Sequence, residues 1–190
     1  AVRCIMNEWF NGKKVALVGN AASLFDKDYG TEIDSHEVVV RLNKAAMLYT
    51  RMDASRSHGS ITTHWLFFNT GEYKHKFGNI PQNIKKAHMS KFRQTAMHQR
   101  DVDFMLPVDE LELLKDKLGH KNPTTGIMSI FWIAKSQPKL LDVYGFDWKE
   151  TPTFTDMERK KDPMCNHDFE KERDLCFREW FSQPHIKWRN

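Results

Sequence analysis

Lys13-Lys14-Val15-Ala16-Leu17-Val18-Gly19-Asn20-Ala21-Ala22-Ser23-Leu24 carries the clearest structural signal in this chain of 190 residues. An apolar run over residues 15–18 stops at a glycine, and an asparagine and small residues follow. This pattern predicts a buried first strand that leads through a tight turn into a short helix over 21–25. Ligands of open α/β sheets bind beyond the carboxyl ends of the strands, where small residues let a phosphate or a base reach the backbone amides. The segment therefore indicates a nucleotide site after the first strand.

A second strand is expected over 37–42, where Val38-Val39-Val40 forms the continuous β-branched run typical of a strand buried on both faces. Asn43 follows at its carboxyl end. Because the carboxyl ends of neighbouring parallel strands meet at one edge of a sheet, Asn20 and Asn43 are expected there together. Their side-chain amides can both donate and accept hydrogen bonds, which suits a nucleotide.

The rest of the chain alternates between further strand and helix signals. Expected strands are 61–69, 83–89, 102–106 and 140–144, and expected helices are 91–100, 108–118, 127–134 and 166–181. Polar stretches predict a mobile loop near the site over 44–60 and a lid or acceptor-side loop over 148–165. The alternation predicts a single α/β domain over 1–190, Rossmann-like, with a mostly parallel sheet and helices on both faces.

Composition narrows the classes of function. The net charge of +4 and the isoelectric point near 8.9 are mildly basic and suit anionic small molecules or glycans. The clustered basic arms of a nucleic-acid binder are absent from the sequence. No apolar run approaches the ~18–20 residues of a membrane span, and residues 1–9 do not read as a signal peptide. Three widely spaced cysteines, Cys4, Cys165 and Cys176, argue against a disulfide scaffold.

Three groups of ordered residues together resemble the sialyl motifs of the sialyltransferases, glycosyltransferase family 29. The large motif is matched by Gly19-Asn20, Ser23-Leu24, Tyr29-Gly30, Ile33-Asp34-Ser35-His36 and Arg41-Leu42-Asn43. The small motif is matched by Pro123-Thr124-Thr125-Gly126 and Val143-Tyr144-Gly145-Phe146. The very small motif is matched by His167 and Glu172, which four residues separate.

The resemblance implies an inverting enzyme with a variant GT-A-type fold. Its donor would be a CMP-sugar, most often CMP-sialic acid, and its acceptor a hydroxyl of a glycan or glycolipid. Such a donor carries one phosphate bridging to the sugar, so that no metal is needed to neutralise a diphosphate, and no further cofactor is expected. The sequence agrees, because no Asp-x-Asp stands at a strand end.

His167 is the candidate general base, since the start of a helix disfavours the imidazolium and helps to keep the ring neutral near pH 7. Glu170 or Glu172 could orient the ring or counter its charge. A simple helix cap is the alternative interpretation of His167. Matching motif positions and strand-end geometry assign to CMP a larger set: Gly19, Asn20, Ala21, Ser23, Asn43, Asn122, Thr124, Thr125, Gly126, Tyr144, Gly145, Phe146 and Asp147.

Two departures from the family pattern qualify these expectations. Animal members carry a histidine near the leaving phosphate, but no histidine lies between Asp147 and Asn166. The leaving group would then be stabilised by Tyr144, His120, Arg41 or helix amides, and CMP-Kdo becomes an alternative donor. Members of the secretory pathway have a disulfide at positions where this chain has Val15 and Gln137. That absence predicts a reducing, cytoplasmic compartment, as in a bacterial or viral member, in preference to the Golgi lumen.

Other functions remain open at this stage. The chain could be a catalytically silent CMP-binding domain. An enzyme that uses S-adenosylmethionine or NAD is disfavoured, because no Gly-x-Gly-x-x-Gly is present. A metal site of Cys165, His167, Cys176 and His185 is disfavoured because their spacing matches no recognised zinc pattern.

Overall fold

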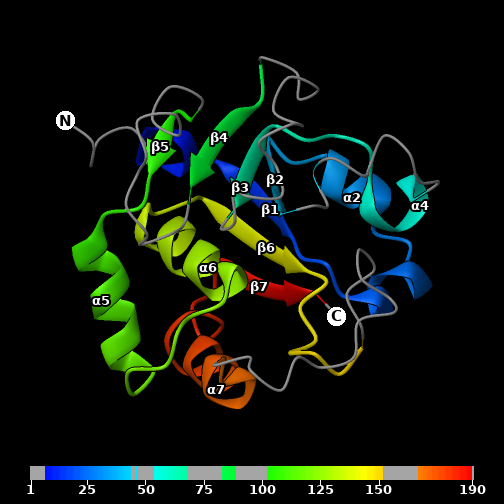
Figure 1. Cartoon of the computed structure of the whole chain (residues 1–190). Coiled ribbons are helices and arrows are strands. Elements are labelled where there is room, and N and C mark those ends of the chain that lie inside the picture. Colours follow the sequence, from blue (N-terminus) through cyan, green and yellow to red (C-terminus); the bar gives the residue numbers. More distant parts are fainter. Residues whose placement is uncertain are drawn as a thin grey trace.

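The structure is a computed structural model, and it describes residues 7–43, 46, 54–67, 83–88, 102–151 and 167–189. Within these residues, seven parallel strands form one sheet in the order β5-β4-β3-β2-β1-β6-β7 (Figure 1). The strands are β1 (Lys14–Val18), β2 (Val38–Leu42), β3 (His64–Phe67), β4 (Lys85–His88), β5 (Phe104–Met105), β6 (Leu140–Tyr144) and β7 (Ile186–Arg189). The helices are the 3-10 helix η1 (Ala22–Asp26), α2 (Gly30–Asp34), α4 (Ser55–His58), α5 (Val108–Lys117), α6 (Thr125–Lys135) and α7 (Phe169–Glu179).

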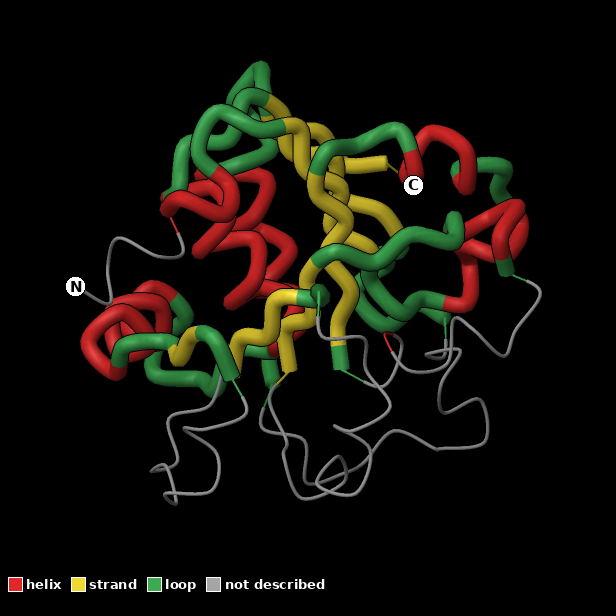
Figure 2. Tube along the Cα trace, turned by 90° about the horizontal axis from the view of Figure 1, so that it is seen from above, coloured by secondary structure: helices red, strands yellow, loops and turns green. Residues whose placement is uncertain are grey.

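Side chains of the central strands alternate between two hydrophobic clusters. Val15 and Leu17 of β1 pack into a large cluster with α5, α6 and α7. Ala16 and Val18 face the other way and pack with apolar residues of η1 and α2. Figure 2, the view from above, shows helices on both sides of the strands. The predicted parallel sheet with helices on both faces is therefore confirmed, and its buried central strands are as apolar as that arrangement requires.

The expected elements agree with the structure to within a few residues, with local differences. Of the strand expected over 61–69, β3 begins only at His64, and its four residues are all buried, while Ile61 before it is exposed. Residues 68 and 69 lie outside the described residues. Helix α4 lies inside the loop expected over 44–60, and α2 and β7 were not predicted. These elements have only four or five residues, too few to show a period. The helix expected over 91–100 and most of the loops over 44–53 and 152–165 lie outside the described residues.

The side chain of Phe146 joins three elements at the carboxyl edge of the sheet. A Cβ added to Gly19, after β1, would lie 2.7 Å from the Phe146 ring and 2.4 Å from the carbonyl oxygen of Gly145. A Cβ added to Gly126, in the first turn of α6, would lie 2.6 Å from the same ring. From the sequence, the small residues after β1 are expected to admit a ligand. The structure gives a different reason for Gly19 and Gly126, because the ring of Phe146 occupies the space beside both.

A buried ion pair fixes β6 against the end of α2. His36 Nε2 lies 3.0 Å from Asp142 Oδ2, and Arg189 Nε of β7 donates to Asp142 Oδ1 at 2.8 Å. Burial lowers the pKa of His36, but the hydrogen bond to Asp142 and backbone contacts outweigh burial, and the pKa is raised on balance. Burial raises the pKa of Asp142, yet its bonds to His36 and Arg189 lower it overall. Both shifts favour the charged forms of the two groups.

We expect this pair to make stability depend on pH in a predictable direction. Because the pKa of His36 is above 6.5 in the folded protein, the stabilisation from His36 is complete below pH 6.5 and is lost as the pH rises through the raised pKa. Urea unfolding across neutral and alkaline pH should show this decline in the parent and not in His36→Gln. Asp142→Asn should cost about 3 kcal/mol, because it leaves a buried charge without its partner. A free energy of unfolding in the parent that stays level above neutral pH would contradict the assignment.

Packing at Phe146 gives a second prediction. Gly126→Ala should lower the free energy of unfolding by roughly 1–3 kcal/mol, because the new Cβ overpacks the ring. Adding Phe146→Leu should recover part of that loss, which a double-mutant cycle measures as a coupling free energy. Gly19→Ala is the comparison, since its Cβ also meets the backbone oxygen of Gly145 and a smaller residue at 146 cannot relieve it. Equal recovery for both glycine variants would show that the ring is not the obstacle.

Candidate active site

The turn after β1 is tied to the end of β6 through the backbone. The amide of Gly19 donates to the Tyr144 carbonyl at 2.7 Å, and that of Ala21 donates to the Gly145 carbonyl at 3.1 Å. Gly145 takes a positive φ of 67°, which lets the chain reverse there. The expectation that Ala21 offers its amide to a nucleotide does not fit this geometry, because the amide is already used within the protein.

Asn20 and Asn43 lie at the ends of neighbouring strands, as predicted. Asn20 Nδ2 donates to the Leu42 carbonyl at 3.4 Å, whereas its Oδ1 is buried without a hydrogen-bond partner among the described residues. A buried amide oxygen of this kind is suited to accept from a ligand hydroxyl or amine. Asn43, at a φ of 49°, receives the Trp65 indole N–H on its carbonyl at 2.8 Å and so joins β2 to β3.

Two other residues predicted to contact CMP instead contact each other. Asp147 is buried, and its Oδ2 accepts from Ser23 Oγ at 3.1 Å and from the Thr151 amide at 3.0 Å. The Ser23 amide donates to Thr151 Oγ1 at 3.2 Å. An ionised carboxylate only accepts hydrogen bonds, so these donors hold the loop after β6 against η1. Asp147 thereby fixes the position of this loop at the edge of the site.

Helix α6 begins at this edge, and a residue of α7 binds its N-cap residue. Thr124 is the N-cap, with Oγ1 accepting from the Ile127 amide at 3.2 Å. The Thr124 amide donates to Glu172 Oε1 at 2.8 Å, and Thr124 Oγ1 donates to Glu172 Oε2 at 2.6 Å. Thr125 and Gly126 follow in the first turn, where helix amides lack partners within the helix and attract anions.

Glu172 is only 2 % exposed, and burial raises its pKa to about 7. The hydrogen bonds from Thr124 act in the opposite direction without cancelling the effect of burial, and Asp168 adds to the rise. The sequence predicts Glu172 or Glu170 beside the histidine ring. The structure corrects this: both Glu172 oxygens bind Thr124, and Glu170 is exposed in the first turn of α7.

His167 is held by the backbone of the segment that precedes α6. Its Nδ1 lies 2.6 Å from the Asn122 carbonyl oxygen, which can only accept, so Nδ1 carries the proton. In the neutral ring, Nε2 is then the basic nitrogen. The helix cap itself is the next residue, Asp168, which accepts from the Lys171 amide at 3.1 Å. The Asn122 carbonyl thus orients the histidine, and the nucleotide contact expected of Asn122 stays a prediction.

The side chains suggested for stabilising the leaving group are placed elsewhere. The Tyr144 hydroxyl donates to Glu32 of α2 at 2.9 Å, and burial strongly raises its pKa. Arg41 is fully buried and donates to the Ile61 carbonyl, Thr62 Oγ1 and the His58 carbonyl. The His120 side chain is 84 % exposed. The helix amides at the start of α6 remain as the candidate from the sequence analysis.

Two groups close to the site were not identified from the sequence. Thr151 completes the contacts of Asp147, and buried His58, packed on Phe25 with ring centroids 4.7 Å apart, closes α4 over η1. Burial, followed by the charge of Arg41, lowers the pKa of His58 to about 4, so that this histidine is neutral near pH 7. Neither residue belongs to a sequence pattern, because both act through contacts between distant segments.

Within the described ranges, no group of three histidine, cysteine or acidic residues could hold a metal ion. Cys176 of the metal hypothesis is buried in the core, and Cys165 lies outside the described residues. None of the helices that the structure describes is long and apolar enough to cross a membrane.

Known proteins of one family resemble this chain in sequence and in fold. The family model of glycosyltransferase family 29 (sialyltransferase) matches residues 10–108, more than half of the chain. A relative from Mus musculus, CMP-N-acetylneuraminate-beta-galactosamide-alpha-2,3-sialyltransferase 1, is 39% identical over 72 residues, which cover 38% of this chain and 19% of the relative. The aligned part thus spans about a fifth of that relative's length.

Two solved structures have the same fold. A mammalian sialyltransferase superposes with a TM-score of 0.70 at 21% identity, covering 94% of this chain and 69% of the other. The sialyltransferase CstII of Campylobacter jejuni, in complex with the substrate analogue cytidine-5'-monophosphate, superposes with a TM-score of 0.55 at 17% identity, covering 89% and 77%. Because the family model matches more than half of its length, the chain belongs to glycosyltransferase family 29, the sialyltransferases.

Proposed function

We propose that the chain is an inverting sialyltransferase of variant GT-A type that moves sialic acid from CMP-sialic acid to a hydroxyl of an acceptor glycan. The observation that carries the proposal is the contact between His167 Nδ1 and the Asn122 carbonyl, because it leaves Nε2 as a base beside the start of α6. The relative's name, which specifies a β-galactosamide acceptor and an α-2,3 linkage, supports a galactose-terminated acceptor.

In the proposed reaction, His167 Nε2 takes the proton of the acceptor hydroxyl while the hydroxyl oxygen attacks the anomeric carbon of the donor sugar. The bond from that carbon to the bridging phosphate oxygen breaks, and its electron pair leaves with CMP. Attack from the face opposite the leaving group inverts the anomeric configuration. General base catalysis of this kind contributes about 10²- to 10⁴-fold to a rate.

The leaving phosphate would face the amides of Thr125 and Gly126 at the start of α6, where fixed dipoles stabilise developing negative charge. Asn20 Oδ1 would accept from a hydroxyl or amine of the nucleotide, which satisfies its buried oxygen. This division gives catalysis to His167 and donor affinity to Asn20, so that the two functions can be separated by mutation.

The reducing compartment expected from the sequence remains part of the proposal. Val15 is completely buried within β1, and Gln137 follows α6 with its carbonyl bound to the Gly12 amide at 3.1 Å. Core packing holds Val15 and a backbone hydrogen bond holds Gln137, so neither position depends on a disulfide.

His167→Ala should lower kcat by about 10²- to 10⁴-fold while the affinity for CMP changes little. Asn20→Ala should instead weaken CMP binding by about tenfold, the equivalent of one buried hydrogen bond. Transfer assays with CMP-sialic acid and CMP-Kdo, combined with calorimetric titration of CMP, measure both quantities. Lys171→Ala, on the exposed side of the same helix turn, is the matched control for His167. Binding of CMP without transfer of either sugar would identify a catalytically silent CMP-binding domain.

We expect turnover to be unaffected by EDTA, because a single bridging phosphate and the helix amides require no divalent cation to balance charge. The measurement is the initial rate after dialysis against EDTA, with and without added Mg²⁺ or Mn²⁺. A rate that collapses on chelation and returns with one of these ions would overturn the proposed leaving-group chemistry.

A further inference from the structure

Helix α7 contributes a buried carboxyl, that of Glu172, to the site, in addition to His167 just before the helix. The carboxyl of Glu172 is buried and receives both hydrogen-bond donors of Thr124, at 2.8 and 2.6 Å. Among the described residues no cation is paired with it: Thr124 donates both hydrogen bonds to the carboxyl, and the nearby charge is that of Asp168, which is also negative. An ionised carboxyl in that position places an uncompensated negative charge directly behind the start of α6.

We propose that Glu172 takes up a proton when CMP binds at the start of α6, and that this proton releases the Thr124 hydroxyl to donate to the phosphate. The inference rests on the proposed function, since it concerns the same donor site. Glu172 is in this account a positioning residue, because it acts on the nucleotide through Thr124.

The donors and acceptors around Thr124 Oγ1 explain how its hydroxyl proton is released from Glu172. With Glu172 ionised, Thr124 Oγ1 must donate its proton to Oε2, while its lone pair accepts from the Ile127 amide. With Glu172 protonated on Oε2, the direction of the 2.6 Å bond reverses, and Oγ1 accepts from both Glu172 and Ile127. The hydroxyl proton of Thr124 is then available to an anion in front of the helix. The proton added to Glu172 comes from the buffer, and no covalent bond changes.

Electrostatic interactions also favour the uptake of a proton by Glu172 when CMP binds. The pKa of Glu172 is already about 7 without ligand, because burial disfavours the charged carboxyl. A phosphate bound near the same helix start is a second negative charge, and like charges within ~4–6 Å raise a carboxyl pKa further. The remaining groups that face Glu172 do not oppose this effect: Asp168 is acidic, and burial followed by Glu172 itself raises the pKa of the Cys176 thiol.

The test is calorimetric titration of the full chain with CMP near pH 8 in buffers of different ionisation enthalpy. The slope of observed enthalpy against buffer enthalpy gives the number of protons taken up, and we expect ~0.5–1 per CMP. The affinity for CMP should correspondingly fall by up to about tenfold per pH unit above neutrality.

Glu172→Gln is the decisive variant, because glutamine reproduces the protonated acid. Its amide oxygen accepts from the Thr124 amide, and its N–H donates to Thr124 Oγ1. We expect CMP to bind this variant with no proton uptake and with an affinity that no longer falls with pH. Glu110→Gln is the matched control, since Glu110 is also buried but pairs with Lys135 at the far end of α6. Its proton uptake should equal that of the parent, with thermal melting to verify folding.

The outcomes separate this inference from the proposed function. CMP binding without proton uptake in the parent would overturn the inference and leave the donor assignment standing. Uptake that persists in Glu172→Gln but disappears in His167→Gln would assign the proton to the histidine and also overturn it. A chain that does not bind CMP at any pH would overturn both proposals.

Discussion

Contact between the Phe146 ring and two glycines is the constraint on which the site depends. Gly19 directly follows β1 and Gly126 lies in the first turn of α6, so the ring sets the distance between a strand end and a helix start. The carbonyl of Phe146 also accepts from the Trp188 indole at 2.9 Å, which joins β7 to the same point. A single aromatic side chain thus determines where the helix amides lie relative to the strands.

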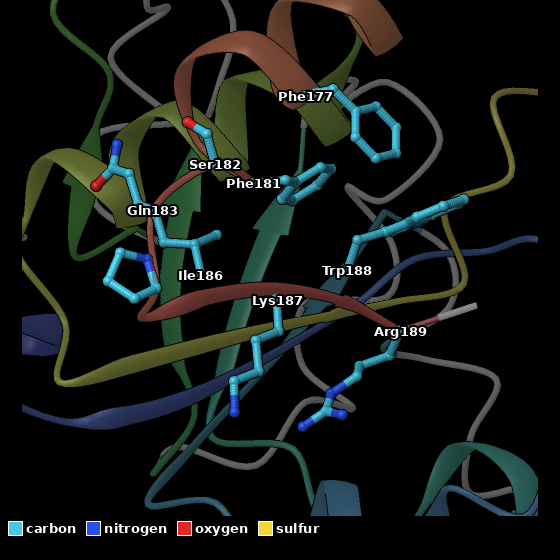
Figure 3. Close-up of a pocket in the computed structure, with 9 residues that line it drawn as sticks. Phe177, Phe181, Ser182, Gln183, Ile186, Lys187, Trp188 and Arg189 are labelled. Carbon is cyan, nitrogen blue, oxygen red and sulfur yellow. The ribbon is translucent and has the colours of Figure 1, made fainter.

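The edge strand β7 also carries the pocket drawn in Figure 3, where Phe177 and Phe181 of the α7 region face Trp188. The ring planes of Phe181 and Trp188 are nearly parallel, at 18°. This packing holds the α7 region against the edge strand, and His167 lies just before the other end of α7. The last strand therefore contributes to the site through the helix that it stabilises.

Much of the fold could be predicted from the sequence, because buried parallel strands are continuous apolar runs and long amphipathic helices repeat every three to four residues. Val38-Val39-Val40 and the helix ending before Gly119 are of this kind. Elements α2, α4 and β7 could not be predicted, since their few residues gain stability from contacts with distant segments. At the site, the sequence predicted that Asn20 and Asn43 follow neighbouring strands and that His167 precedes a helix, but it did not predict their hydrogen-bond partners. That Glu172 binds Thr124, and that Asp147 binds Ser23, depends on the folded chain and on no local pattern.

The group that orients His167 is a main-chain oxygen, and this has a consequence for how the protein tolerates change. No substitution at position 122 removes a carbonyl, so the tautomer of the histidine is insensitive to which side chain stands there. Only a shift of the main chain can alter it, and the proline at 123 restricts such a shift by fixing its own φ. Comparisons of sequences would show position 122 as free to vary even though its peptide group is indispensable. Selection would then act on the main-chain conformation of the segment, and substitution of side chains one at a time would not reveal it.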